Sequence, residues 1–190
     1  MSEAMESMQL ETGTGDPVRH LVQRLETRYR SRITGRVTLP ERPARLQPLP
    51  GELDPRLAAA LRSRGVQQLY SHQREAWDAV TAGRHTVVVT PTASGKTLCY
   101  NLPVLQAALK DRAKALYLFP TKALSQDQVA ELMELNEAGG LGIRAFTFDG
   151  DTPGDARKAV RTKGDIVVSN PDMLHQGVLP HHTKWAQFFE

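Results

Sequence analysis

The sequence contains few cysteines, few aromatic residues and no long apolar run. Its single cysteine, Cys99, excludes an internal disulfide and a cysteine-rich metal site within these 190 residues. No stretch approaches the ~20 consecutive apolar residues that a membrane-spanning helix needs. The first residues, MSEAMESMQLETGTGD, lack the basic and then apolar regions of a secretory signal. We therefore expect a cytoplasmic protein that has no membrane partner.

Lysine is absent from the first half of the chain, where arginine takes its place. The first lysine is Lys96, whereas the Lys/Arg cations between Val18 and Gly65 are all arginines and outnumber the acids. The net charge of +3 and the pI of about 9.2 allow contact with nucleic acid, but proteins that never meet nucleic acid have similar values. On charge alone, we interpret the arginine-rich stretch as a solvated surface.

The distribution of apolar residues and prolines divides the chain into three parts. Residues 1–15 are polar and have no period, so we expect them to be disordered. Residues 16–52 form an arginine- and proline-rich arm, in which apolar residues at three- and four-residue spacings predict a helix over residues 18–30. The five prolines of residues 40–55 then favour extended chain. A folded domain is predicted for residues 53–190.

From about Val66 onward, helical patterns alternate with apolar runs of strand length. Ser71 is predicted to cap a helix that ends near Gly83. The predicted strands follow, with helical patterns between them, at residues 85–90, 114–119, 143–148 and 165–169. Parallel strands require crossovers of this length, so the pattern predicts an α/β domain with a parallel sheet flanked by helices.

Three aromatic residues lie close together near the end of the sequence. Trp185, Phe188 and Phe189 have the spacing i, i+3 and i+4, which places them on one face of a helix. A stripe of this kind faces a core more often than it forms a platform for stacking bases. We therefore predict that these three side chains are buried.

The stretch TPTASGKT, residues 90–97, matches most of a phosphate-binding loop. The template G-x-x-x-x-G-K-[ST] lies between a strand and a helix, and here only its first glycine is replaced, by Thr90. Backbone N–H groups at the start of the helix would point at phosphate oxygens. Lys96 would reach the β- and γ-phosphates of ATP, and the Thr97 hydroxyl would bind Mg²⁺. The predicted nucleotide contacts are Thr92, Ala93, Ser94, Gly95, Lys96 and Thr97.

The stretch QLYSHQREAW, upstream of this loop, holds two further candidates for nucleotide binding. Gln73 lies at the start of a predicted helix, where its amide could pair with both the N6 donor and the N7 acceptor of adenine. Tyr70 could stack on the same base. Gln73 alone would be interpreted as an exposed helix residue, but together with the loop it indicates recognition of adenine.

Two other helix starts follow predicted strands. Pro120, Thr121 and Lys122 put a hydroxyl and a cation at a helix start on the edge of a parallel sheet, where ligands bind. Asn170 and Pro171 begin another helix. Because asparagine caps helices well and proline suits the first turn, a purely structural role explains this pair equally well.

The stretches TPTASGKT, PTKALSQDQ, DGDTP and SNPDMLH, in this order and spacing, resemble motifs of the superfamily 2 helicases of the DEAD/DEAH-box type. LYSHQ, DGDTP and NPDMLH…LPHHTKW most resemble the branch of the bacterial mitomycin-repair helicases and their fungal RecQ-like relatives, which act on DNA. The loop departs from the commoner AxTGSGKT form at Thr90 and Ala93. We expect this departure to matter little, because backbone amides hold the phosphate.

The resemblance covers residues 53–190 and implies the RecA-like domain of an ATP-dependent DNA helicase that acts in DNA repair. It implies ATP and Mg²⁺ as cofactors and single-stranded DNA or a DNA fork as partner. Lys96 and Thr97 would be catalytic, and Gln73 would read adenine. The implied nucleic-acid contacts are Pro120, Thr121, Lys122, Gly150, Asp151, Thr152, Asn170 and Pro171.

One motif of these helicases is missing from the sequence. They need a hydrophobic strand ending in Asp-Glu, which holds Mg²⁺ and positions the attacking water, and the 190 residues contain no adjacent Asp-Glu pair. Asp149, at the end of AFTFD, could mimic this motif, but the resemblance assigns that segment to a DNA-facing turn. The resemblance places the acidic strand shortly after WAQFFE.

We therefore expect a RecA-like domain that is incomplete at its C-terminus. It would pair with a second such domain in a parent enzyme and be inactive alone. Two alternatives stay open from the residues themselves. One is a P-loop kinase or another small-molecule NTPase, and the other is a nucleotide- or DNA-binding module that has no catalytic activity.

Overall fold

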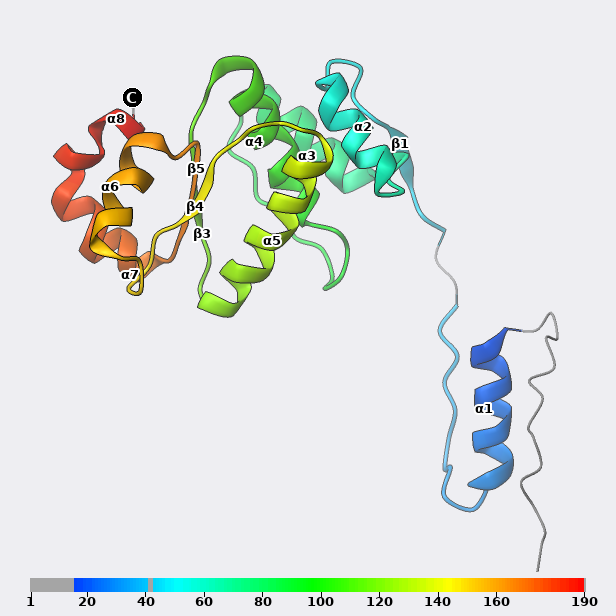
Figure 1. The fold of residues 1–190 in the computed structure, drawn as a ribbon. Helices are drawn as coiled ribbons and strands as arrows, with labels where there is room; N and C mark the ends of the chain where they lie inside the picture. Colours follow the sequence, from blue (N-terminus) through cyan, green and yellow to red (C-terminus); the bar gives the residue numbers. More distant parts are fainter. Residues whose placement is uncertain (1–15, 41–42, 190) are drawn as a thin grey trace, which may run out of the picture. The chain divides into compact units, whose positions relative to one another are not determined.

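The computed structural model describes residues 16–40 and 43–189, which fall into two compact units divided after Pro43 (Figure 1). The predicted disorder of residues 1–15 lies outside the described residues. Within the described ranges, no helix is long and apolar enough to cross a membrane.

The described residues of the first unit contain one helix, α1 (Pro17–Arg28). Asp16 caps it by accepting the Val18 N–H at 3.0 Å, and Pro17 suits the first turn because its missing N–H would have no helical partner. The helix predicted over residues 18–30 is therefore present, but none of its residues is buried. The apolar face stays open to solvent, with Val18 65% and Leu21 54% exposed.

The second unit begins at Ala44. Strand β1 (Leu46–Pro48) pairs antiparallel with β2 (Gln68–Tyr70), so the end of the predicted arm belongs to this unit. Between them lies α2 (Pro55–Ser63), which Asp54 caps by accepting the Arg56 N–H at 2.9 Å.

A parallel sheet forms the centre of this unit, as the sequence predicts, but it has three of the four predicted strands. Its strands are β3 (Ala115–Leu118), β4 (Ala145–Thr147) and β5 (Ile166–Ser169), in the order β3-β5-β4. The main helices are α3 (Ser71–Thr81), α4 (Thr97–Asp111), α5 (Lys122–Ala138) and α6 (Gly154–Lys163). The chain then continues through α7 (Pro171–Met173), a π-helical turn (Leu174–Val178), a 3-10 segment (Leu179–Trp185) and α8 (Ala186–Phe189).

Both faces of the sheet are covered by helices, and β5 is buried along its whole length. Ile166 and Val168 pack into a core shared with α2, α3, α4 and α5, whereas Val167 packs into a second core with residues of α6 and the C-terminal segments. Alternate side chains of a strand point to opposite faces, which explains this division. Figure 1 shows α6, α7 and α8 on one side of the strands and α3, α4 and α5 on the other.

Two of the three aromatic residues predicted to be buried do lie in the second core. Trp185 is 1% and Phe188 4% exposed, and the Trp185 ring meets the Phe148 ring edge-on with centroids 4.9 Å apart. Phe189 is 52% exposed, so its prediction is wrong. The helical face that it was assigned to does not continue, because a 3-10 segment precedes the single turn of α8.

The strand predicted at residues 85–90 is absent. This segment has no regular secondary structure, and Val87 is 90% and Val89 88% exposed. A strand is stabilised by hydrogen bonds to a neighbour, and within the described residues this segment pairs with no other strand. The three consecutive valines, Val87 to Val89, therefore form no ladder here.

Candidate nucleotide-binding site

The predicted phosphate-binding loop leads directly into the N-terminus of α4, which begins at Thr97. Two of its residues have positive φ, Gly95 at 73° and Ala93 at 58°. The Thr90 and Ser94 hydroxyls lie 2.6 Å apart and close the loop with a hydrogen bond. The sequence predicts that alanine in place of glycine at position 93 has little effect on phosphate binding, and this stays a prediction. For the backbone, however, a side chain at this left-handed position is unfavourable.

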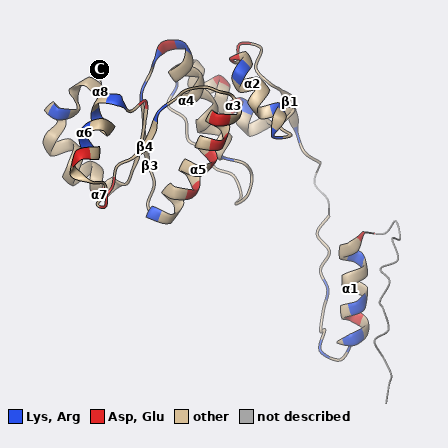
Figure 2. Cartoon of the chain, in the orientation of Figure 1, with Lys and Arg blue, Asp and Glu red and all other residues tan. Residues whose placement is uncertain are grey.

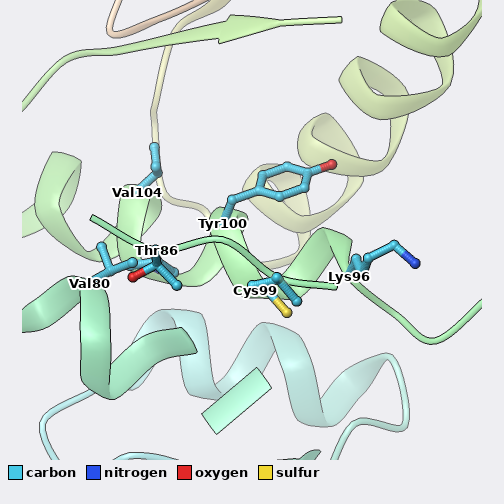
Figure 3. A pocket seen from close by; sticks show the side chains of 8 residues that line it. Val80, Thr86, Lys96, Cys99, Tyr100 and Val104 are labelled. Carbon is cyan, nitrogen blue, oxygen red and sulfur yellow. The ribbon is translucent and has the colours of Figure 1, made fainter. Parts of the chain in front are cut away.

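Lys96 lies over its own loop. Its ammonium donates to the Pro91 carbonyl at 2.7 Å and to the Thr90 carbonyl at 3.1 Å. In Figure 3 its nitrogen points away from Val80 and Thr86. The loop carbonyls thus hold the charge of this lysine within the loop, which is where the sequence predicts the phosphates.

Helix α3 holds the loop through two consecutive side chains. The Gln73 side chain, in a residue only 3% exposed, accepts the Tyr70 N–H at 2.9 Å and donates to the Gly95 carbonyl at 2.8 Å. His72 Nε2 lies 2.9 Å from the Ser94 carbonyl oxygen. A Cβ atom at Gly95 would lie 2.7 Å from Gln73 Nε2, so a side chain there would displace this amide, and the positive φ of Gly95 also favours glycine.

Tyr70 and His72 form a stacked pair at the start of α3, with ring centroids 5.8 Å apart and planes 11° from parallel. Tyr70 is 45% exposed, so one aromatic ring beside the loop remains open to solvent. Tyr70 and Gln73 are predicted from the sequence as base contacts, whereas the contact of His72 with the loop is not. The position of His72 beside Gln73, at the start of the predicted helix, was the one feature of the sequence that pointed to a contact with the loop.

An apolar cavity of about 410 Å³ lies between residues 86–88 and α4, beside the stem of Lys96 (Figure 3). Burial raises the pKa of the Cys99 thiol that lines it. Burial also raises the pKa of Tyr100, whose hydroxyl donates to Gln128 of α5. The walls are Val80, Thr86, Val88, Lys96, Cys99, Tyr100, Pro103 and Val104. With these walls, the cavity suits apolar groups better than phosphate.

The predicted nucleic-acid contacts all follow the carboxyl ends of β3, β4 and β5. Because these strands are parallel, the three loops meet at one edge of the sheet. An ion pair between Lys122 and Asp151 joins the start of α5 to the loop after β4. In Figure 2, the ribbon of α5 is blue at one end, for Lys or Arg, and red farther along it, for Asp or Glu.

Several side chains at this edge shape the backbone. Thr121 caps α5 by accepting the Leu124 N–H at 3.3 Å, and Asn170 caps α7 by accepting the Met173 N–H at 2.8 Å. The Thr152 hydroxyl accepts the Asp149 N–H at 2.9 Å. Asp149 in turn accepts the Asp151 N–H at 3.0 Å, so its carboxylate closes a turn. This geometry fits the turn interpretation of Asp149 better than that of a free magnesium ligand.

Comparison with known proteins gives a match over most of the second unit. A family model described as "DEAD/DEAH box helicase" matches residues 70–189. The uncharacterized ATP-dependent helicase YprA of Bacillus subtilis is 55% identical over 150 residues, which are 78% of this chain and 20% of that protein. The ATP-dependent helicase hrq1 of Schizosaccharomyces pombe is 42% identical over 147 residues, 76% of this chain and 14% of that protein.

Solved structures give the same result. The DUF1998 helicase MrfA bound to DNA and AMPPNP is 55% identical, with a TM-score of 0.75 over 78% of this chain and 21% of that chain. The helicase Lhr of Mycobacterium smegmatis bound to ssDNA and AMP-PNP is 25% identical, with a TM-score of 0.59 over 65% of this chain and 18% of that chain. The present chain thus spans about a fifth or less of these relatives.

Proposed function

Because the chain belongs to the DEAD/DEAH box helicases, we propose that its second unit is the ATP-binding part of an ATP-dependent DNA helicase. The observation that carries this proposal is the loop of residues 90–97 at the N-terminus of α4, with Lys96 at the N-cap of the helix and its ammonium on the loop carbonyls. The RecA-like fold shared with MrfA, whose structure contains DNA and AMPPNP, supports it. A cytoplasmic location stays part of the proposal.

The residues of the loop fit a triphosphate. The Leu98 and Cys99 N–H groups of α4 already donate to the Gly95 and Lys96 carbonyls, so the loop N–H groups that precede them are the ones that would meet phosphate, and the helix dipole favours an anion there. Lys96 would exchange its loop carbonyls for phosphate oxygens, and the Thr97 hydroxyl would hold Mg²⁺ together with the nucleotide. When bound, ATP would supply the free energy that drives movement along the nucleic acid.

Adenine recognition by Gln73 is compatible with the bonds that this side chain makes. A primary amide has two N–H donors and two oxygen lone pairs, and Gln73 uses one of each on Tyr70 and Gly95. One donor and one lone pair remain for N7 and N6 of adenine. Tyr70, exposed beside it, would stack on the base.

The nucleic acid would lie across the edge formed by the loops after β3, β4 and β5. Lys122 is the cation of this edge among the predicted contacts, and it would meet a backbone phosphate. The N–H groups at the start of α5 that Thr121 does not cap would add contacts to phosphate. Contacts of this type do not depend on base sequence, as a motor that moves along a strand requires.

Calorimetric titration with ATP and Mg²⁺ tests the nucleotide site. We expect Lys96→Ala to weaken binding roughly ten-fold or more, because a charge-assisted hydrogen bond to phosphate is lost. Lys110→Ala is the matched control, since Lys110 is an exposed lysine near the end of the same helix. Circular dichroism checks that both variants fold. Equal ATP affinities for the wild type and Lys96→Ala would contradict the assignment of the loop.

A further inference from the structure

His72 makes a contact with the phosphate-binding loop that no other side chain duplicates. Its Nε2 lies 2.9 Å from the Ser94 carbonyl oxygen, and because a carbonyl can only accept, Nε2 must carry the proton. The neighbouring Gly95 carbonyl is held twice, by Gln73 and by the Leu98 N–H at 3.3 Å. Within the described part of the chain, the Ser94 carbonyl has no hydrogen-bond partner except His72.

The position of this carbonyl determines where the next amide points. The Ser94 C=O and the Gly95 N–H belong to one peptide unit, and in a planar trans peptide these two groups point in opposite directions. His72 draws the carbonyl toward α3, so the Gly95 N–H points away from α3. Gln73 acts in the same way on the next peptide unit. It holds the Gly95 C=O, so the Lys96 N–H of that unit points in the opposite direction.

We propose that His72 is a positioning residue of the nucleotide site, which orients the Gly95 N–H toward the phosphates by holding the Ser94 carbonyl. The inference rests on the proposed binding of ATP by this loop. His72 itself touches no phosphate in this arrangement. Glycine has a wide φ range, so without this hydrogen bond the Ser94–Gly95 peptide unit could adopt several orientations. By fixing one orientation before the nucleotide binds, His72 reduces the conformational entropy that is lost on binding.

The ring of His72 also stacks on Tyr70, so the experiment must separate the ring from the donor. His72→Phe keeps an aromatic ring but has no donor. His72→Gln has no ring, but its Nε2 can still donate at a similar distance from the backbone. His72→Phe therefore tests the loss of the hydrogen-bond donor, and His72→Gln tests the loss of the ring.

The measurement is calorimetric titration of the 190-residue chain with ADP, pyrophosphate and adenosine. We expect His72→Phe to weaken pyrophosphate and ADP by roughly three- to ten-fold, the value of one hydrogen bond, and to leave adenosine unchanged. His72→Gln should regain most of the pyrophosphate affinity. In ¹⁵N–¹H spectra of the unliganded chain, the Gly95 amide resonance should move in His72→Phe and return toward its wild-type position in His72→Gln.

Two results would overturn the role of His72. The first is a His72→Phe variant that binds pyrophosphate as tightly as the wild type. The second is a loss of pyrophosphate affinity in His72→Gln as large as in His72→Phe, because the ring rather than the donor would then matter. Wild-type protein that binds neither ADP nor pyrophosphate would instead overturn the proposed nucleotide site, and this inference with it.

Discussion

Ala93 has a backbone conformation that suits glycine better. Its φ of 58° lies in the left-handed region, where Cβ approaches the following carbonyl oxygen at a cost of roughly 1–2 kcal/mol. Ala93→Gly removes this clash, although glycine also makes the unfolded chain more flexible. We expect a net gain of about 0.5–1 kcal/mol in the free energy of unfolding, measured by urea denaturation.

The matched control for this change is Ala130→Gly. Ala130 is exposed in the middle of α5, where glycine should cost about 1 kcal/mol instead. The opposite signs of the two changes would identify the backbone conformation as the cause. A destabilised Ala93→Gly variant would show that the alanine side chain makes contacts worth more than the strain.

Lys122 and Asp151 form an exposed ion pair at the edge proposed for nucleic acid. The pairing raises the pKa of Lys122 and lowers that of Asp151. A phosphate that binds Lys122 must compete with this carboxylate. We therefore expect Asp151→Asn to strengthen binding of single-stranded DNA by roughly two- to five-fold. Lys122→Ala should weaken binding to all DNA sequences alike. It should also reduce the slope of the logarithm of the binding constant against the logarithm of the salt concentration by about one unit, as measured by fluorescence anisotropy.

Asp155→Asn controls for net charge, because Asp155 is an exposed acid in the first turn of the neighbouring α6. An equal gain in both aspartate variants would mean that only overall charge matters. If the salt dependence of DNA binding is the same in Lys122→Ala as in the wild type, Lys122 does not contact a phosphate and is only a solvated surface residue.

At the scale of elements, Arg144 and Asp165 join the beginnings of β4 and β5. The Asp165 carboxylate accepts the Arg144 backbone N–H at 2.9 Å and two guanidinium N–H groups at 2.8 and 3.0 Å. Burial alone would raise the pKa of Asp165, but the hydrogen bonds and the charge of Arg144 lower it below its ordinary value of 3.8. This lowering links the stability of the strand pair to pH.

A depressed carboxyl pKa contributes stability above its unfolded value and loses it as pH falls through the folded value. For Asp165, stability should therefore decline below about pH 4. Asp165→Asn should cost about 1 kcal/mol at pH 7 and show a smaller decline in acid. Urea denaturation at pH 7, 4 and 3 measures both effects. Asp111→Asn, an exposed acid at the end of α4, is the control. Parallel acid curves for wild type and Asp165→Asn would contradict this linkage.

The sequence predicted helix starts better than it predicted strands, because the signals of a helix start are local. Asp54 and Asn170 each accept an N–H two or three residues ahead, and the following proline suits the first turn. The run at residues 85–90 has the composition of a strand, but a ladder depends on a partner from elsewhere in the chain.

The same distinction applies to the candidate site. The loop of residues 90–97 was predictable, because its residues are consecutive. The contact of His72 with Ser94 spans 22 residues and was not predictable from composition or period. The left-handed φ of Ala93 could not be predicted either, because alanine in a sequence does not indicate a positive φ.

At the scale of the whole molecule, hydrolysis needs parts that these 190 residues do not provide together. Phosphoryl transfer to water needs the loop, a lysine, Mg²⁺ held by a hydroxyl and an acid, a residue that positions the water, and an arginine finger. The chain supplies the loop, Lys96 and Thr97, but it contains no adjacent Asp-Glu pair. Asp149, the remaining candidate acid, is engaged in its own turn.

We therefore predict that the 190-residue chain binds ATP but shows no DNA-stimulated ATPase activity and no unwinding. Movement along a strand further requires two domains that close and open around ATP with different affinities for DNA. The informative comparison is a chimera in which this chain replaces the matching region of full-length YprA, which it covers to 20%. The chimera should hydrolyse ATP in response to single-stranded DNA, and Lys96→Ala should abolish this activity. DNA-stimulated hydrolysis by the 190-residue chain alone, lost in Lys96→Ala, would contradict the prediction and make Asp149 a working magnesium ligand.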